Sequence, residues 1–228
     1  MPVNREKFAE ITDELRRSDC RLVAVSKTKP IDEILELYQL GQRDFGENYV
    51  QELLEKQSKL PADIGWHFIG HLQSNKVKFI APFVHLIHGV DSHKLLREIN
   101  KQGERNNRTI ECLLQVHIAQ EETKFGFDEN ELEQLLIGGQ AELDGLKNLK
   151  ITGLMGMASF TNDMDKVKQE FHRLKTTYDR FASNQTANCK FSILSMGMSS
   201  DYRLAITEGS NMVRIGSLLF GAREISMQ

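Results

Sequence analysis

A lysine follows the first short apolar run of the chain and is the first residue with reactive potential. Residues 22–25 read Leu-Val-Ala-Val, and Ser26 and Lys27 come directly after them. Burial disfavours the ammonium form of a lysine and lowers its pKa. A neutral lysine amine can attack an aldehyde and form a Schiff base. The alternative is a lysine that reaches from a strand end to solvent, and periodicity alone leaves both interpretations open.

An arginine, Arg214, lies inside the last apolar run of the chain, residues 212–216. An unpaired buried ion costs several kcal/mol, so this guanidinium needs a partner. The partner is either a carboxylate of the protein or an acceptor on a ligand. Gly216 and Ser217 come next, and a glycine permits close approach of the backbone. Two backbone amides and the Ser217 hydroxyl could therefore hold a phosphate.

A second loop of small residues, 195–201, reads Ser-Met-Gly-Met-Ser-Ser-Asp and precedes an expected helix. Ser199 or Ser200 suits the N-cap of that helix. Free N–H groups and a hydroxyl at a helix N-terminus favour an anion. In a (β/α)8 barrel, the loops after strands seven and eight are the usual phosphate site. Ordinary capping and turn formation is the competing interpretation.

Other polar and sulfur-containing residues give weaker signals. Asn48 follows an expected strand and is either a ligand contact or a helix N-cap. Met157 ends another strand and could line a flat ring, although a core methionine explains it as well. His67 and His71 have the four-residue spacing of a helical metal pair, but residues 66–69 read as a strand. We therefore reject metal binding and expect no metal site in this chain.

The elements that must position these residues alternate along the chain. Apolar, β-branched runs predict eight parallel strands, and charged segments with apolar residues three or four apart predict helices between them. We expect strands at 21–26, 43–45, 66–69, 84–90, 110–118, 151–157, 191–196 and 212–216. We expect helices at 31–40, 49–59, 74–81, 93–106, 129–140, 164–182 and 201–208, with an extra N-terminal helix at 5–17.

This order predicts a single (β/α)8 barrel domain over residues 1–228. An open doubly wound sheet is the alternative, but no G-x-G-x-x-G follows the first strand. The net charge of -3 shows no basic excess that would point to nucleic acid or a membrane. Three scattered cysteines form no disulfide framework, and the N-terminus has no apolar signal region, so we expect a cytoplasmic protein.

The lysine, the arginine and the two small-residue loops together suit an aldehyde that carries a phosphate, as pyridoxal 5'-phosphate does. At these residues the chain resembles the pyridoxal phosphate homeostasis proteins, the YggS/PROSC family. The resemblance rests on residues 23–30, 45–52, 66–76, 195–199 and 213–216, which read VAVSKTKP, FGENYVQE, WHFIGHLQSNK, SMGMS and VRIG.

The resemblance implies a barrel of the alanine racemase type, fold type III of the pyridoxal phosphate proteins, without that enzyme's C-terminal β-domain. It implies a Schiff base at Lys27 and phosphate contacts from Ser195 and from the backbone around Gly216 and Ser217. It also implies that Arg214 lies at the pyridine nitrogen. A cation there discourages protonation of the ring and makes the cofactor a poorer electron sink.

The leading expectation is a monomer without a dedicated catalytic activity, which buffers the cofactor and hands it to apo-enzymes. The first alternative is an amino-acid racemase of low activity, which needs a second acid/base group on the opposite ring face. Tyr49 and Tyr202 are the candidates for that group, and neither has a compelling position. A Schiff-base aldolase acting on a sugar phosphate is the second alternative, but Ser26 and Thr28 are poor acid/base partners for Lys27.

Overall fold

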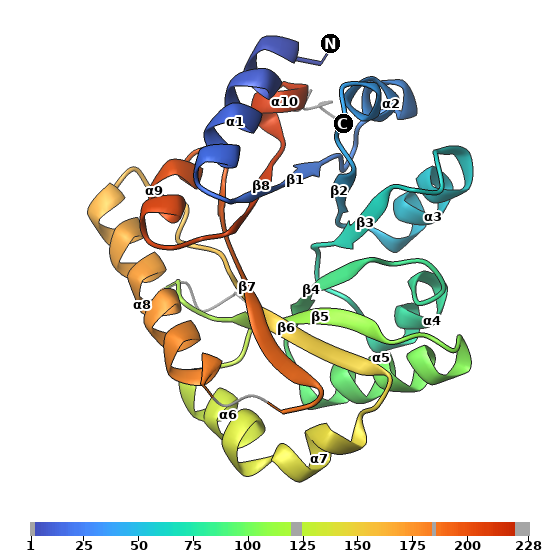
Figure 1. Ribbon diagram of the computed structural model, residues 1–228, viewed down its shortest axis with the longest axis vertical. Helices are drawn as coiled ribbons and strands as arrows, with labels where there is room; N and C mark the ends of the chain where they lie inside the picture. Colours follow the sequence, from blue (N-terminus) through green and yellow to red (C-terminus); the bar gives the residue numbers. More distant parts are fainter. Residues whose placement is uncertain (1–2, 120–124, 184–185, 222–228) are drawn as a thin grey trace, which may run out of the picture.

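Eight parallel strands close into a barrel, and helices surround it on the outside (Figure 1). The structure, a computed structural model, describes residues 3–119, 125–183 and 186–221. Each strand pairs with the next along the chain, and β8 closes the barrel by pairing in parallel with β1, Val23 opposite Arg214. The predicted (β/α)8 barrel is confirmed.

The strands are β1 (Arg21–Val25), β2 (Asp44–Glu47), β3 (Gly65–Phe68), β4 (Leu86–Val90), β5 (Ile110–Val116), β6 (Leu149–Gly156), β7 (Cys189–Met198) and β8 (Met212–Ile215). The helices are α1 (Arg5–Arg17), α2 (Ile31–Gln39), α3 (Val50–Lys59), η1 (Ser74–Lys76), α4 (Val77–Ile80), α5 (His93–Arg105), α6 (Glu129–Glu133), η2 (Gln134–Gly138), α7 (Gln140–Gly145), α8 (Met164–Ala182), α9 (Tyr202–Thr207) and α10 (Ser217–Phe220).

Two apolar clusters follow from the alternation of side chains along the strands. The larger cluster fills the space between the barrel and its helices, and α8 contributes Val167, Phe171, Leu174 and Phe181 to it. The smaller one fills the barrel interior and consists of Val23, Leu86, Leu113, Met155, Ile193 and Met212. The helix periodicity that predicted α8 therefore marks the face that this helix buries.

Four helical segments differ from the expectations, and one of them is α7, which begins where the helix predicted at 129–140 ends and extends to Gly145. The helix predicted at 129–140 is interrupted: Asp128 caps α6 through a capping box with Glu131, but a π-helical turn follows and ends at Gly138. The segment at 74–81 begins with a 3-10 turn before α4. The four-residue helix α10 after β8 was not predicted, because it is too short to show a periodicity.

The N-terminal helix α1 packs against α10, and the N–H of Asn4 donates to the carbonyl of Leu219 at 2.9 Å (Figure 1). Parallel strands place all their carboxyl ends at one end of the barrel. Lys27, Asn48, Met157 and Ser217 therefore all follow strands at the same end. Among the described residues, no helix is long and apolar enough to cross a membrane.

Candidate functional site

A pocket of about 500 Å³ opens at the carboxyl ends of the strands. This volume lies within the range of small-molecule sites. Of the eight predicted site residues, seven line the pocket: Lys27, Asn48, Met157, Ser199, Arg214, Gly216 and Ser217. The rest of the described lining is Val25, Lys29, Ile69, Phe160, Met198, Ser200, Leu218 and Gly221.

The pocket lining is cationic. Lys27, Lys29 and Arg214 contribute positive side chains, and the described lining includes no aspartate, glutamate, histidine, tyrosine or cysteine. A described lining with three cationic side chains and no acidic side chain favours an anionic ligand. Apart from the two lysines, this part of the lining also offers no side chain suited to general acid/base chemistry near neutral pH.

A buried ion pair holds the end of β1, from which the pocket lysine follows. Ser26 and Glu47 are fully buried, and the Ser26 hydroxyl donates to Glu47 Oε1 at 2.6 Å. Lys56 of α3 donates to the same carboxylate oxygen and to the Ser26 carbonyl, each at 2.7 Å. Burial raises the pKa of Glu47, against the opposing effect of Lys56. The pair thus joins β1, β2 and α3 below the pocket.

The turn after Lys27 is fixed to the same helix. Thr28 has a φ of 62°, a left-handed conformation that is uncommon for a threonine. Its backbone N–H donates to Glu52 Oε1 at 2.5 Å, and Lys56 donates to that oxygen at 2.6 Å. Because the backbone is held on both sides of Lys27, the direction in which this side chain leaves the strand is set by the scaffold.

Arg214 is only 4% exposed, and the negative charge of Asp201 partly offsets the effect of this burial on its pKa. Burial lowers its pKa to about 10, so the group stays cationic at neutral pH. Nη1 donates to the Ser195 carbonyl at 3.0 Å, and Nη2 donates to the Gly156 carbonyl at 3.0 Å. The guanidinium thus already has protein partners, two backbone carbonyls and the Ser195 hydroxyl, which neither of the two interpretations from the sequence included.

Ser195 is the predicted site residue that does not line the pocket. It is fully buried within the barrel, and its Oγ accepts a hydrogen bond from Arg214 Nη1 at 2.6 Å. The phosphate contact expected of Ser195 stays a prediction; in the structure its hydroxyl contacts the guanidinium instead. The physical reason is depth: β7 continues to Met198, so Ser195 lies inside the strand and not in the loop after it.

Two buried histidines extend this polar contact into the barrel. Ser195 Oγ lies 3.3 Å from His88 Nδ1, and His88 Nε2 lies 2.8 Å from His67 Nδ1. Burial lowers the pKa of both histidines, so the neutral rings are favoured. Sequence analysis did not assign these contacts to the site. The available signal was a histidine inside each of two apolar strands, which requires a polar partner when buried.

Two features of the pocket concern the binding of a polar ligand: a free acceptor atom and the close packing of two loops. Asn48 Oδ1 is buried and has no hydrogen-bond partner, so it is available as an acceptor for a ligand donor. The Gly216 N–H donates to Ser199 Oγ at 3.2 Å, which joins the loops after β7 and β8. A Cβ at Gly216 would lie 3.1 Å from the Val25 carbonyl oxygen, so the glycine permits the close approach of these strands.

The tyrosines do not supply a second acid/base group. The chain has four tyrosines, all within the described residues, and none lines the Lys27 pocket. Tyr202 is buried and donates to Glu14 of α1 at 2.9 Å. Tyr49 is 61% exposed and lines a neighbouring hollow with Asn48. The requirement of a two-base racemase is therefore not met by either candidate residue.

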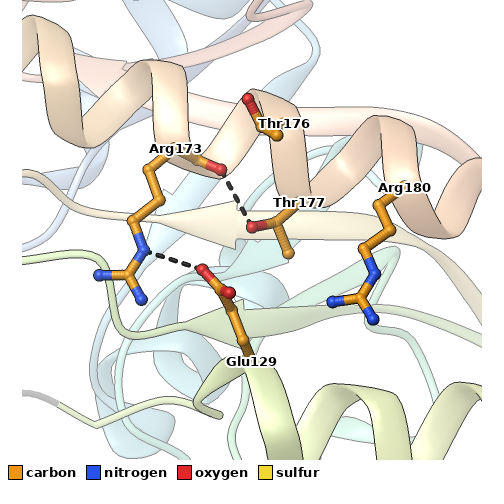
Figure 2. A pocket seen from close by; sticks show the side chains of 5 residues that line it. All are labelled: Glu129, Arg173, Thr176, Thr177 and Arg180. Carbon is orange, nitrogen blue, oxygen red and sulfur yellow. Dashed lines mark hydrogen bonds and ion pairs between the residues drawn. The ribbon is translucent and has the colours of Figure 1, made fainter.

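A separate hollow lies on the outside of the molecule, between α6 and α8 (Figure 2). Arg173 pairs with Glu129 at 2.9 Å, and Arg180 pairs with Glu133 at 2.6 Å. All four side chains are well exposed, and exposed pairs of this kind contribute little to stability. Because both arginines already have carboxylate partners, this hollow does not compete with the barrel pocket as an anion site.

Known proteins share both the sequence and the fold of this chain. Residues 4–224 match the model of the family described as alanine racemase, N-terminal domain. A pyridoxal phosphate homeostasis protein of Aquifex aeolicus is 40% identical over 211 residues, which are 92% of this chain and 90% of that protein. The solved structure of PipY from Synechococcus elongatus with PLP bound is 35% identical, with a TM-score of 0.84 over 95% of this chain and 99% of that chain. An alanine racemase of Clostridium difficile is 15% identical, with a TM-score of 0.69 over 99% of this chain and 60% of the racemase chain. At this identity the likeness shows the fold alone.

Proposed function

Because the chain belongs to the family of pyridoxal phosphate homeostasis proteins, we propose that it binds pyridoxal 5'-phosphate in the Lys27 pocket and buffers the cofactor in the cell. The family membership confirms the resemblance seen in the sequence. The observation that carries the proposal is the cationic lining: Lys27, Lys29 and Arg214 face one pocket that has no carboxylate in its described part. A phosphate ester of an aldehyde matches both the charge and the lysine.

Each pocket residue has a role in this proposal. The cofactor supplies an aldehyde, which condenses with a neutral amine and releases water. Lys27 is the amine, on a turn that α3 holds in place. The loops after β7 and β8, with Ser199, Gly216 and Ser217, bind the phosphate through N–H and hydroxyl groups. Asn48 offers its unpartnered carbonyl oxygen to a donor on the ligand.

Arg214 and Met157 would contact the ring of the cofactor. Arg214 remains a cation at neutral pH, since burial lowers its pKa only to about 10. A cation at the ring nitrogen keeps that nitrogen unprotonated and limits the electron-sink chemistry on which many cofactor-dependent enzymes rely. Met157 is half-buried in the lining and can pack against a flat ring.

We propose further that the protein has no dedicated catalytic activity. The absence of histidine, tyrosine and carboxylate side chains from the described lining supports storage over catalysis. The bond to Lys27 is reversible, because water or another amine can displace it, and this suits a reserve that releases the cofactor to apo-enzymes. We also retain the expectation of a monomer. A racemase of low activity is the alternative, and a screen of L-amino acids for D-products distinguishes the two.

The visible absorption spectrum of the protein with added pyridoxal phosphate tests the proposal. We expect a band that moves to shorter wavelength on treatment with borohydride, and a reduced adduct that peptide mass analysis locates at Lys27. A protein that stays colourless with excess cofactor would contradict the proposal and favour a sugar-phosphate substrate for the same pocket.

Ser195 gives a separate prediction about the position of Arg214. Ser195→Ala removes the 2.6 Å hydrogen bond to the guanidinium but leaves both carbonyl acceptors. Since hydrogen bonds to charged groups contribute about 1.5–3 kcal/mol, we expect a stability loss of this order. We also expect cofactor affinity to fall by up to about tenfold, which corresponds to about 1.4 kcal/mol.

Urea unfolding and cofactor titration measure the two effects of Ser195→Ala. Ser192→Ala is the matched control, because Ser192 lies on the same strand but is exposed, and exposed substitutions usually change stability by less than about 0.5 kcal/mol. Equal affinities for Ser195→Ala and Ser192→Ala would show that Ser195 does not position Arg214.

A further inference from the structure

Three side chains with metal-binding atoms lie close together near the starts of β2, β3 and β4, at the end of the barrel opposite the Lys27 pocket. Asp44 is the first residue of β2, His67 lies within β3, and His85 directly precedes β4. One ligand atom from each of them lies within 4.8 Å of the other two. We propose that Asp44, His67 and His85 bind a divalent transition-metal ion of the zinc type.

The buried member of the cluster has a ring nitrogen without a hydrogen bond. His67 is fully buried, and its Nε2 has no hydrogen-bond partner. The same atom lies 3.3 Å from Asp44 Oδ1. Two ligand atoms bound at about 2.0–2.1 Å in tetrahedral geometry are about 3.3 Å apart. The spacing of this pair therefore already matches the first two ligands of a zinc ion.

The other ring nitrogen of His67 has the partner that a metal-binding histidine requires. His67 Nδ1 lies 2.8 Å from His88 Nε2, and His88 Nδ1 lies 3.3 Å from Ser195 Oγ. With its proton on Nδ1, His67 donates to His88 and presents the Nε2 lone pair to Asp44 and His85. Outer partners of this kind fix the tautomer and the orientation of a ligating histidine.

The glycine at position 65 leaves room for the Asp44 carboxylate beside His67 and His85. Gly65 is the first residue of β3, and a Cβ there would lie 2.6 Å from Asp44 Oδ1 and 3.7 Å from the His85 ring. Any other residue would force the carboxylate to move. His85 is exposed, so the cluster is open to solvent on one side. An ion could enter from that side and keep water as a fourth ligand.

The charges around the cluster set the expected affinity. Arg21 is a nearby cation: its charge acts on both Asp44 and His67, and it opposes a metal ion between them. We therefore expect moderate affinity in the wild-type protein, and tighter binding once Arg21 is neutralised.

The chemistry of the donor set selects the class of ion. Two imidazoles and one carboxylate suit zinc, cobalt and nickel, whereas calcium and magnesium prefer oxygen ligands. From the sequence, metal binding was considered only for the pair His67 and His71, and it was rejected because residues 66–69 read as a strand. In the structure His71 lies 3.1 Å from Asp91 instead, and it is not a member of this cluster. A metal ion bound by these three residues would link β2, β3 and the residue that precedes β4.

Cobalt(II) gives a direct spectroscopic test, because its ligand-field bands report coordination by the protein. The purified protein is treated with a chelator, freed of it, and titrated with Co²⁺. We expect visible ligand-field bands that saturate at one equivalent. We also expect Zn²⁺ to displace the Co²⁺ and to raise the Tm, because an ion that binds only the folded state stabilises it.

Two single substitutions at accessible ligands provide the variants. His85→Ala and Asp44→Asn are each expected to weaken Co²⁺ binding by about tenfold or more, since loss of even outer-shell groups costs that much. His172→Ala is the matched control: it removes an exposed histidine that pairs with Glu208 on another part of the surface. Arg21→Gln is expected to tighten Co²⁺ binding, because it removes a repelling charge.

The possible results of this experiment distinguish a metal site at Asp44, His67 and His85 from its absence. Saturable bands whose Co²⁺ affinity falls by about tenfold or more in both His85→Ala and Asp44→Asn, and stays unchanged in His172→Ala, would establish the site. Wild-type protein without ligand-field bands would overturn the proposal, and so would bands of unchanged affinity in His85→Ala and Asp44→Asn. Unchanged Tm values of the variants without metal verify that the substitutions left the fold intact. None of these measurements depends on the Lys27 pocket.

Discussion

Lys27→Ala is expected to abolish the borohydride-trapped adduct with pyridoxal phosphate completely. Alanine has no amine, so the covalent bond to the aldehyde cannot form. Arg214 and the loops proposed to bind the phosphate remain in place, so we expect a weaker, noncovalent affinity to remain. Absorption spectra before and after borohydride, together with the mass of the intact protein, measure the loss of the adduct and the remaining binding.

Lys29 supplies the matched control for this result. It is two residues away and lines the same pocket, but its Nζ donates to the Phe220 carbonyl at 2.7 Å. Lys29→Ala therefore removes a neighbouring amine and a positive charge, and we expect it to keep the trapped adduct. If Lys27→Ala retained the adduct and Lys29→Ala lost it, the attachment point proposed here would be wrong.

Among the proposed substitutions, Lys56→Met is expected to lower the free energy of unfolding the most. The Lys56 side chain is 5% exposed and pairs with Glu47, which is fully buried. Glu47 Oε2 has no hydrogen-bond partner, so without Lys56 its charge rests on the Ser26 hydroxyl alone. Removing one partner of a buried ion pair typically costs about 3–5 kcal/mol. Urea unfolding followed by circular dichroism measures this cost.

The pH dependence of Lys56→Met has a defined sign. Burial already raises the pKa of Glu47, and loss of the Lys56 charge raises it further. Between the unfolded and folded pKa values of this carboxyl, the folded state binds more protons, so acidification favours folding. The stability difference between wild type and Lys56→Met should therefore shrink as the pH falls through the raised pKa of Glu47.

A surface ion pair on the same helix gives the comparison for Lys56→Met. Lys59 pairs with Glu55 at 2.8 Å, and both side chains are more than half exposed. Lys59→Met should change stability by no more than about 1 kcal/mol, because solvent screens an exposed pair. Similar losses for the two substitutions would show that Glu47 and Lys56 are not the buried, interdependent pair described here.

The buried pair also connects stability with the proposed function. Lys56 contacts the Ser26 carbonyl directly, and Glu52 holds the Thr28 N–H on the other side of Lys27. Loosening these contacts frees the turn from which Lys27 extends. We therefore expect folded Lys56→Met to bind pyridoxal phosphate more weakly than wild type, although Lys56 is not part of the pocket lining.

The sequence by itself determined the elements and most of the pocket. Apolar runs and helical spacing are local patterns, so they predicted the eight strands and α8 within a few residues. Parallel strands bring their carboxyl ends together, so residues after different strands could be assigned to one site before any contact was known. This is why Lys27, Asn48, Met157 and Ser217 were predicted together.

Only the tertiary structure decided which polar groups meet inside the barrel. The depth of Ser195 depends on how far β7 extends, and its contact with Arg214 joins residues 19 positions apart. Asp44 begins β2, His67 lies within β3 and His85 precedes β4, and no spacing along the chain shows that their ligand atoms converge. Such contacts depend on strand register and barrel closure, and these are fixed by packing across the whole sheet.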